Sequence, residues 1–138
     1  MEKENKYYVP IIEEFCVGFE FYVDINGEKF KNTFGEVYSE LWQINELIEI
    51  GSAYVKYLDK EDIEVLGWKS SGNENELYSI KWIENPTDRK NAIWLKKFGE
   101  NRLQIIDSRH EWHVSLFYGT IKNKSELKRL MKQLGIWE

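Results

Sequence analysis

The sequence predicts an α+β fold: a single antiparallel β-sheet of about five to seven strands, with a C-terminal amphipathic helix and one or two shorter helices. Three observations support this class. Segments rich in β-branched and aromatic residues recur along the chain, turn sequences such as Asn26-Gly27 separate them, and leucines recur at helical spacing after residue 123. We assign residues 1–138 to one domain and expect residues 1–6 to be frayed.

The first predicted strands form a hairpin. From Phe15 to Val23 every odd position is phenylalanine or valine, while the even positions are more polar, which is the alternation of a half-buried strand. Asn26-Gly27 then favours a type I′ turn, because both of its central residues take a positive φ angle. The returning strand is expected over about residues 28–34.

Two short helices and a strand are predicted between residues 35 and 67. An apolar helical face over residues 41–48 is made of Leu41, Ile44, Leu47 and Ile48, and irregular chain is the alternative for this run. Residues 53–58 have the composition of a strand. Asp59 is expected to cap a short helix that Gly67 ends, and a further strand starts at Trp68.

The last third of the chain predicts more strands and the C-terminal helix. Strands are expected over residues 77–83, 92–98, 103–107 and 112–121. Asn123 fits the N-cap of the helix, Glu126 would complete a capping box, and Gly135 is placed to end the helix in a left-handed conformation. The apolar face of this helix is made of Leu127, Leu130, Met131 and Leu134.

Composition limits the classes of function. Hydrophobic residues make up 42% of the 138 residues and aromatic residues 15%, which is enough for a packed core. The net charge of −5 argues against a general nucleic-acid binder. Cys16 is the only cysteine, so no internal disulfide forms and a reducing cytoplasm is expected. No stretch approaches the roughly 20 apolar residues that span a bilayer, so no membrane partner is expected.

Motifs of known enzymes and cofactor sites are missing from the sequence. It has no GxSxG, P-loop, GxGxxG, CxxC or HExxH pattern, so we predict no catalytic residue, no cofactor and no metal site. Asp107, His110 and His113 could in principle hold a metal or serve a hydrolase or nuclease, which is the enzymatic alternative. The simpler interpretation has one histidine in solvent and the other capping a turn. Cys16 is expected to be a partly buried structural thiol.

Aromatic and basic residues gather on the late predicted strands. Alternation places Trp94, Lys96 and Phe98 on one strand face and Ile93 and Leu95 on the other. The strand is then either covered on both faces or part of an exposed aromatic patch that could stack a base and pair a phosphate. In the competing interpretation, the tryptophans are core and the lysines are their solvated neighbours. The candidate ligand-binding residues are Trp94, Lys96, Arg102, Arg109, His110, Trp112 and His113.

Three segments carry a family resemblance: residues 12–20 (IEEFCVGFE), residues 55–68 (VKYLDKEDIEVLGW) and residues 119–136 (GTIKNKSELKRLMKQLGI). They resemble a group of small uncharacterised proteins encoded by bacteriophages and prophages of gut anaerobic bacteria. The resemblance covers most of the chain and is weakest over residues 70–110. It implies an accessory protein of a phage or mobile element that acts in the bacterial cytoplasm. It implies no activity and no catalytic residues.

The leading hypothesis is a non-enzymatic binding protein that counteracts host defence. It would sequester a small nucleotide or metabolite signal, or block a host protein. Sequestration needs a concave pocket with an aromatic floor and convergent Arg or Lys side chains. Blocking needs a flat patch of roughly 800 Å² per partner. The alternatives are the enzyme described above and a structural homo-oligomer whose exposed aromatic residues form its interface.

Overall fold

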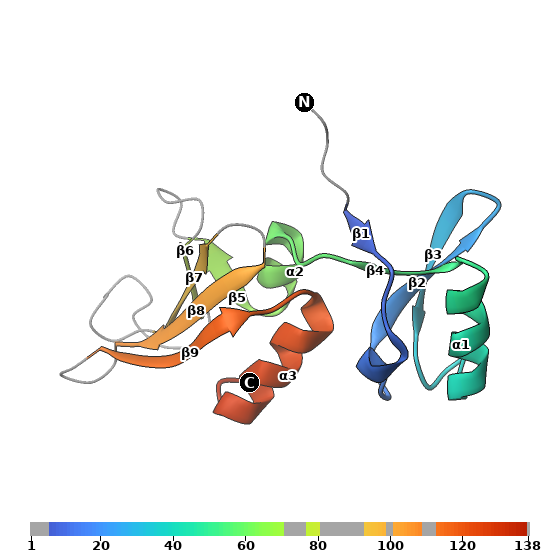
Figure 1. The fold of residues 1–138 in the computed structure, drawn as a ribbon. Coiled ribbons are helices and arrows are strands. Elements are labelled where there is room, and N and C mark those ends of the chain that lie inside the picture. The colour runs from blue at the N-terminus through green and yellow to red at the C-terminus, as the bar shows by residue number, and fades with distance from the viewer. Residues whose placement is uncertain (1–5, 71–76, 81–92, 99–100, 109–112, 138) are drawn as a thin grey trace. The chain divides into compact units, whose positions relative to one another are not determined.

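A computed structural model describes residues 6–70, 77–80, 93–98, 101–108 and 113–137 (Figure 1). Packing divides the chain into two compact units, which we call the N-terminal unit (Met1–Tyr57) and the C-terminal unit (Leu58–Glu138). Each unit has its own sheet and its own hydrophobic core. The assignment of residues 1–138 to one domain stays a prediction.

The α+β class is confirmed, together with the C-terminal helix and two shorter helices. The strands differ from the prediction by forming two antiparallel sheets, of four and five strands, rather than a single sheet. The last strand of the first sheet in the sequence is β4 (Ala53–Lys56). Helix α2 (Lys60–Val65) follows it and is capped by Asp59, whose carboxylate accepts a hydrogen bond from the Asp62 N–H at 2.9 Å. Strand β5 (Trp68–Ser70) then begins the second sheet.

The N-terminal unit is built around the predicted hairpin. Asn26 and Gly27 have φ angles of 56° and 88°, as the type I′ turn requires. The sheet has the order β1-β4-β2-β3, and the short helix η1 and helix α1 belong to the same unit. The bounds are β1 (Tyr7–Tyr8), η1 (Ile12–Glu14), β2 (Glu20–Ile25), β3 (Glu28–Thr33) and α1 (Leu41–Glu49).

The strand predicted from Phe15 begins only at Glu20. Gly18 has a φ angle of 95°, and its N–H donates to the Phe34 carbonyl at 2.9 Å, so the chain turns before it enters β2. The prediction of a partly buried Cys16 was wrong as well, because this turn leaves Cys16 exposed. Phe15 and Phe19 are nevertheless core residues, with ring centroids 4.8 Å apart.

Phenylalanines dominate the core of the N-terminal unit. In α1, Ile44 is fully buried, whereas Leu41 of the predicted apolar face is exposed. Leu47 and Ile48 are partly buried and pack on the core, so α1 is helical as predicted but covers the sheet with a narrower face. The buried residues of this core are Phe15, Phe19, Phe21, Val23, Phe34, Ile44 and Val55.

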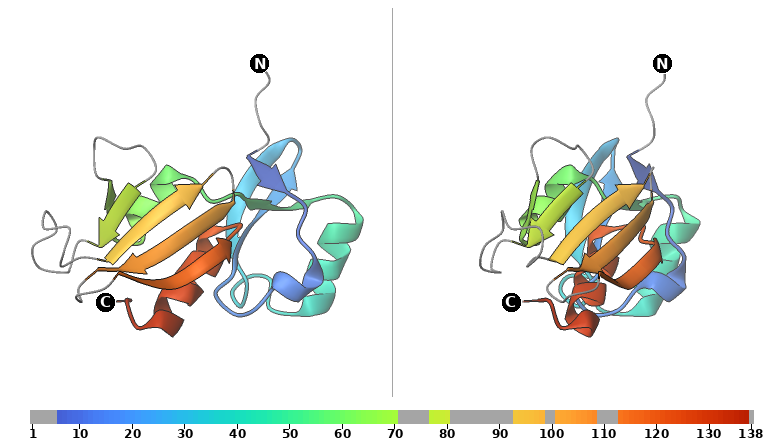
Figure 2. Two further views of the ribbon diagram at one scale, coloured as in Figure 1. Left: turned by 60° about the vertical axis from the view of Figure 1, so that its left-hand side comes forward. Right: turned by 90° about the vertical axis from the view of Figure 1, so that its left-hand side faces the viewer.

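The C-terminal unit has a sheet in which every strand pairs with its neighbour in sequence, in the order β5-β6-β7-β8-β9 (Figure 2). Residues of α2 and of the C-terminal helix α3 pack with one face of this sheet in a common core, which includes Ile63, Trp68, Leu95, Ile105 and Leu127. No helix in the described part of the chain is long and apolar enough to cross a bilayer. The bounds are β6 (Leu77–Ile80), β7 (Ile93–Phe98), β8 (Arg102–Asp107), β9 (Val114–Thr120) and α3 (Lys124–Leu134).

Helix α3 starts and ends as its sequence predicts. The Asn123 side chain accepts a hydrogen bond from the Glu126 N–H at 2.8 Å, and Gly135 has a left-handed φ angle of 76°. The Glu126 carboxylate accepts from the Lys122 N–H at 2.6 Å, one residue earlier than an ordinary capping box.

Replacing Asn123 with alanine is expected to lower the free energy of unfolding by about 1 kcal/mol, because the first turn of α3 loses its acceptor. Urea denaturation followed by circular dichroism measures the change. Asn123→Ser keeps a capping oxygen and is expected to retain most of the stability. Equal losses in the two variants would show that the cap contributes nothing.

Candidate ligand-binding surfaces

The structure describes four of the seven predicted site residues. Trp94 and Lys96 lie on β7, Arg102 begins β8, and His113 precedes β9 and is exposed. Arg109, His110 and Trp112 lie outside the described residues. The described sheet therefore brings Trp94, Lys96 and Arg102 together on one surface.

Strand register places these residues on the sheet face opposite the core. Lys96 pairs with Gln104, and Gln104 pairs with Tyr118. Phe98 pairs with Arg102 in the next row, and directly paired residues share a face. Their neighbours Leu95 and Ile105 point into the core. We call this surface the aromatic–basic face, which consists of Trp94, Lys96, Phe98, Arg102, Gln104 and Tyr118.

An aromatic pair on this face lies between two cations. The rings of Phe98 and Tyr118 meet edge to face, with centroids 5.9 Å apart. The Lys96 Nζ lies 5.3 Å from the Phe98 centroid, and the Arg102 guanidinium carbon lies 5.2 Å from the Tyr118 centroid. An Arg102 Nη also donates a hydrogen bond to the Tyr118 hydroxyl at 3.0 Å. These contacts hold the rings and the positive charges in a defined arrangement.

The aromatic–basic face is accessible and free of acidic residues over its described strand positions. Lys96, Arg102 and Tyr118 are exposed, while Trp94 and Phe98 are half-buried. This face of β7 is therefore partly exposed among the described residues, and the ligand-binding aromatic patch stays a prediction. The charge of the two units also differs. Residues 1–57 contain 5 Lys or Arg and 11 Asp or Glu residues, which gives a net charge of −6. Residues 58–138 contain 14 Lys or Arg and 13 Asp or Glu residues, which gives a net charge of +1.

The described part of the predicted Asp107, His110 and His113 set does not form a metal site. Asp107 is buried at the end of β8, where it pairs with Ile93 and Val114. No group of three His, Cys, Asp or Glu residues suited to a metal ion occurs among the described residues. His110 lies outside them, so the set stays the enzymatic alternative to the predicted absence of a metal site.

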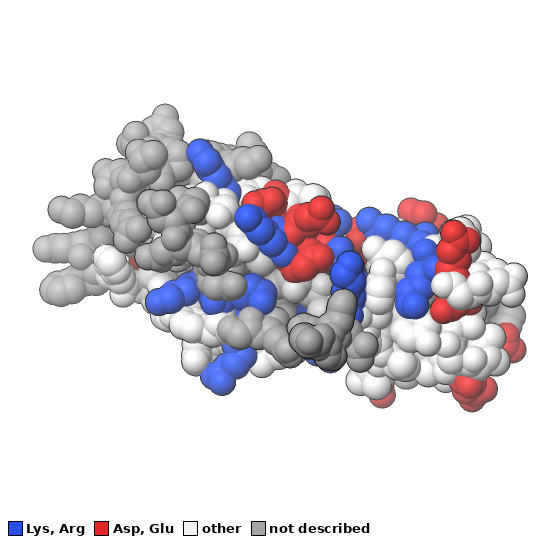
Figure 3. Space-filling model, turned by 90° about the horizontal axis from the view of Figure 1, so that it is seen from above, with Lys and Arg blue, Asp and Glu red and all other residues white. Residues whose placement is uncertain are grey.

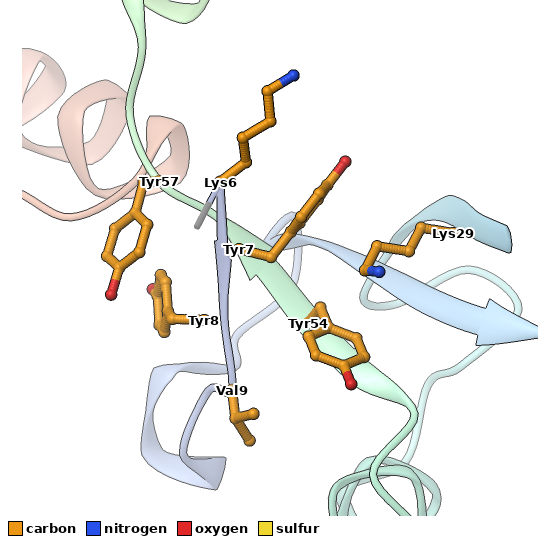
Figure 4. Close-up of a pocket in the computed structure, with 7 residues that line it drawn as sticks. All are labelled: Lys6, Tyr7, Tyr8, Val9, Lys29, Tyr54 and Tyr57. Carbon is orange, nitrogen blue, oxygen red and sulfur yellow. The ribbon is translucent and has the colours of Figure 1, made fainter. Parts of the chain in front are cut away.

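A second surface, in the N-terminal unit, was missed by the sequence reasoning. It is a cleft of about 430 Å³ beside strand β1, which we call the tyrosine cleft (Figure 4). The tyrosines and lysines come from β1 and the residue before it, from β3, and from β4 and the residue after it. Their convergence depends on the pairing of Tyr7 with Lys56 across nearly fifty residues, which no local pattern reveals. The lining residues are Lys6, Tyr7, Tyr8, Val9, Lys29, Tyr54 and Tyr57.

Comparison with models of protein families, with curated proteins and with solved structures finds no match for this chain.

Proposed function

We propose that this protein is a non-enzymatic binding protein that sequesters an oligonucleotide-type ligand on the aromatic–basic face of its C-terminal unit. The observation that carries the proposal is the Phe98–Tyr118 ring pair between Lys96 and Arg102. Nucleobases stack on exposed aromatic rings, and cationic side chains pair with the phosphates that link them. Both kinds of group occur here on one surface, and the described strand positions of that surface include no carboxylate.

The shape of the face favours a ligand with more than one base. Trp94 and Phe98 lie four residues apart on β7, which separates them by roughly 13 Å at the rise of an extended strand. A single nucleotide does not reach both rings, whereas a short single strand does. The limited number of cations also restricts the ligand to few phosphates, in keeping with the net charge of −5 and against general nucleic-acid binding.

The setting that we propose is the bacterial cytoplasm during phage infection, where capture of such a ligand would counteract a host defence signal. The support for this setting is the resemblance of residues 12–20, 55–68 and 119–136 to phage and prophage proteins. The single Cys16 suits a reducing compartment.

Tyr118→Ala is expected to weaken binding of a short labelled single-stranded oligonucleotide by about tenfold or more, because one stacked base is worth roughly 1–3 kcal/mol. Arg102→Gln is expected to weaken it to a similar extent. Fluorescence anisotropy measures the dissociation constants. If two phosphates are paired, the logarithm of the binding constant should fall against the logarithm of salt concentration with a slope of about −1.4.

Two control variants match these changes on other surfaces. Trp137→Ala removes an exposed ring that contacts Lys128 and Lys132 beside α3, and Lys97→Gln removes the charge next to Lys96 on β7. Both are expected to bind as the wild type does. Losses in the controls equal to those in Tyr118→Ala, or no oligonucleotide binding at all, would contradict the proposal.

The same incubation separates binding from catalysis. The oligonucleotide is expected to be recovered intact, as measured by mass spectrometry. Cleavage that disappears in His113→Ala would support the hydrolase or nuclease alternative instead.

A further inference from the structure

We propose that the tyrosine cleft of the N-terminal unit is a separate binding site for a small organic phosphate whose ring lies against tyrosine. This site goes beyond the function proposed above, because it lies in the other unit, shares no residue with the aromatic–basic face and has the size of a small-molecule pocket. Its volume of about 430 Å³ lies within the range of roughly 300–1,000 Å³ that is typical of such pockets.

A fixed ammonium group forms one wall of the cleft. The Lys29 Nζ lies 5.0 Å from the Tyr7 ring centroid and 4.7 Å from the Tyr54 ring centroid. It also lies 3.6 Å from a carboxylate oxygen of Asp24. Figure 4 shows Lys29 reaching toward Tyr7 and Tyr54. An ammonium group held in place loses little further conformational entropy when it pairs with an anion.

The residues that contact Lys29 are themselves held in place by the surrounding sheet. Asp24 pairs with Lys29 across β2 and β3, and its other carboxylate oxygen accepts from the Gly27 N–H at 2.9 Å. The Tyr7 ring packs edge to face on Tyr22 at 5.4 Å, and Tyr22 pairs with Tyr54. The hairpin turn and three tyrosines therefore fix the position of the ammonium.

The residues that line the cleft carry hydrogen-bond donors, and the two carboxylates in contact with them, Asp24 at Lys29 and Glu14 at Tyr8, are not lining residues themselves. Two lysines, Lys6 and Lys29, and four tyrosines are among the lining residues, and their side chains carry ammonium and phenol donors. The Tyr8 hydroxyl donates a hydrogen bond to a Glu14 carboxylate oxygen at 2.7 Å. The ring centroids of Tyr8 and Tyr57 lie 4.8 Å apart. A ligand that matches this lining must be rich in acceptor oxygens and negatively charged, which describes a phosphate ester.

Lysines gather at the cleft although the unit as a whole is acidic. Residues 1–57 contain five lysines against eleven acidic residues. Lys6 and Lys29 line the cleft, and Lys56 pairs with Tyr7 beside it. Lys31 lies on the same sheet face but is 3.4 Å from Glu20 and does not line the cleft. Figure 3 shows such neighbouring basic and acidic side chains on the surface of this unit.

Titration calorimetry of the full chain with four probes tests the inference: adenosine monophosphate, adenosine, ribose 5-phosphate and inorganic phosphate. Adenosine monophosphate is expected to bind with a dissociation constant below about 1 mM, and each of the other probes at least about tenfold more weakly. Equal binding of adenosine would overturn the phosphate contact, and equal binding of ribose 5-phosphate would overturn the tyrosine contact. No binding of adenosine monophosphate overturns the site.

Variants then locate the bound probe. Lys29→Gln and Lys6→Gln are each expected to weaken binding of adenosine monophosphate by about tenfold. Lys6 is exposed, so its variant keeps the test valid if Lys29→Gln fails to fold. Lys31→Gln is the matched control, and Tyr118→Ala tests the other unit; both are expected to bind normally. A loss in Lys31→Gln equal to that in Lys29→Gln, or a loss in Tyr118→Ala, would contradict a site in this cleft.

Discussion

Phe21→Ala is expected to lower the free energy of unfolding by about 3–5 kcal/mol, the usual cost of truncating a buried phenylalanine. Phe21 is 0% exposed and is the second residue of β2. Its ring meets those of Phe15 and Tyr38 at centroid distances of 5.2 and 5.9 Å, so alanine leaves a cavity beside these two rings. Because folded domains are stable by only about 5–15 kcal/mol, the loss is a large fraction of the total.

Urea denaturation measures the change in the free energy of unfolding, and amide hydrogen exchange of residues 20–33 shows where protection is lost. Phe30→Ala is the matched control, since Phe30 lies opposite Val23 on the neighbouring strand but is 46% exposed. The control is expected to lose less than about 1 kcal/mol. A Phe21→Ala loss no larger than that of Phe30→Ala would mean that the phenylalanine cluster does not hold this unit together.

Trp68→Ala is expected to cost about as much in the C-terminal unit, roughly 3–5 kcal/mol. Trp68 is 0% exposed on β5, and its indole N–H donates to the Met131 sulfur of α3 at 3.3 Å. The side chain therefore joins the outer strand of the sheet to the helix that covers it. Removing it leaves a cavity between the two elements and deprives α3 of a contact in its third turn.

Trp42→Ala controls for the loss of a tryptophan as such, because Trp42 is 62% exposed on α1 and its removal is expected to change stability by about 0.5 kcal/mol or less. Met131→Leu keeps the buried volume and removes the sulfur acceptor, and is expected to cost less than about 1.5 kcal/mol. Urea denaturation is again the measurement. A small loss in Trp68→Ala would show that α3 is held by its other contacts.

The elements that local signals determine were predicted well. Asn26-Gly27 requires positive φ angles, Asp59 and Asn123 supply capping oxygens, and Gly135 ends α3; each acts within a few residues. The strand start at Glu20 was missed because the alternation of phenylalanine and valine continues through a turn at Gly18. Phe15 and Phe19 are buried on either side of this turn and Val17 within it is 83% exposed, so the alternation of apolar residues alone does not distinguish the turn from a strand.

The division into two sheets and the tyrosine cleft depend on contacts between distant residues. β1 pairs with β4, and β4 pairs with β2. These partners lie far apart in the sequence, so the local sequence of a strand does not reveal which strand it pairs with. For the same reason, sequence alternation placed Trp94 and Lys96 on one face of β7 but could not show which face the helices cover. The core around Trp68 decides that question, because it collects Ile93 and Leu95 of β7 together with side chains of α2 and α3.

The edges of the four-stranded sheet affect how the protein behaves when concentrated. β3 is an outer strand that carries Glu28, Lys29 and Lys31, and the opposite outer strand, β1, is only two residues long. Charged and very short edge strands oppose the addition of a strand from another molecule, which is the first step of amyloid-like aggregation. The lysines of β3 therefore protect the sheet from fibril growth while Lys29 shapes the cleft beside it.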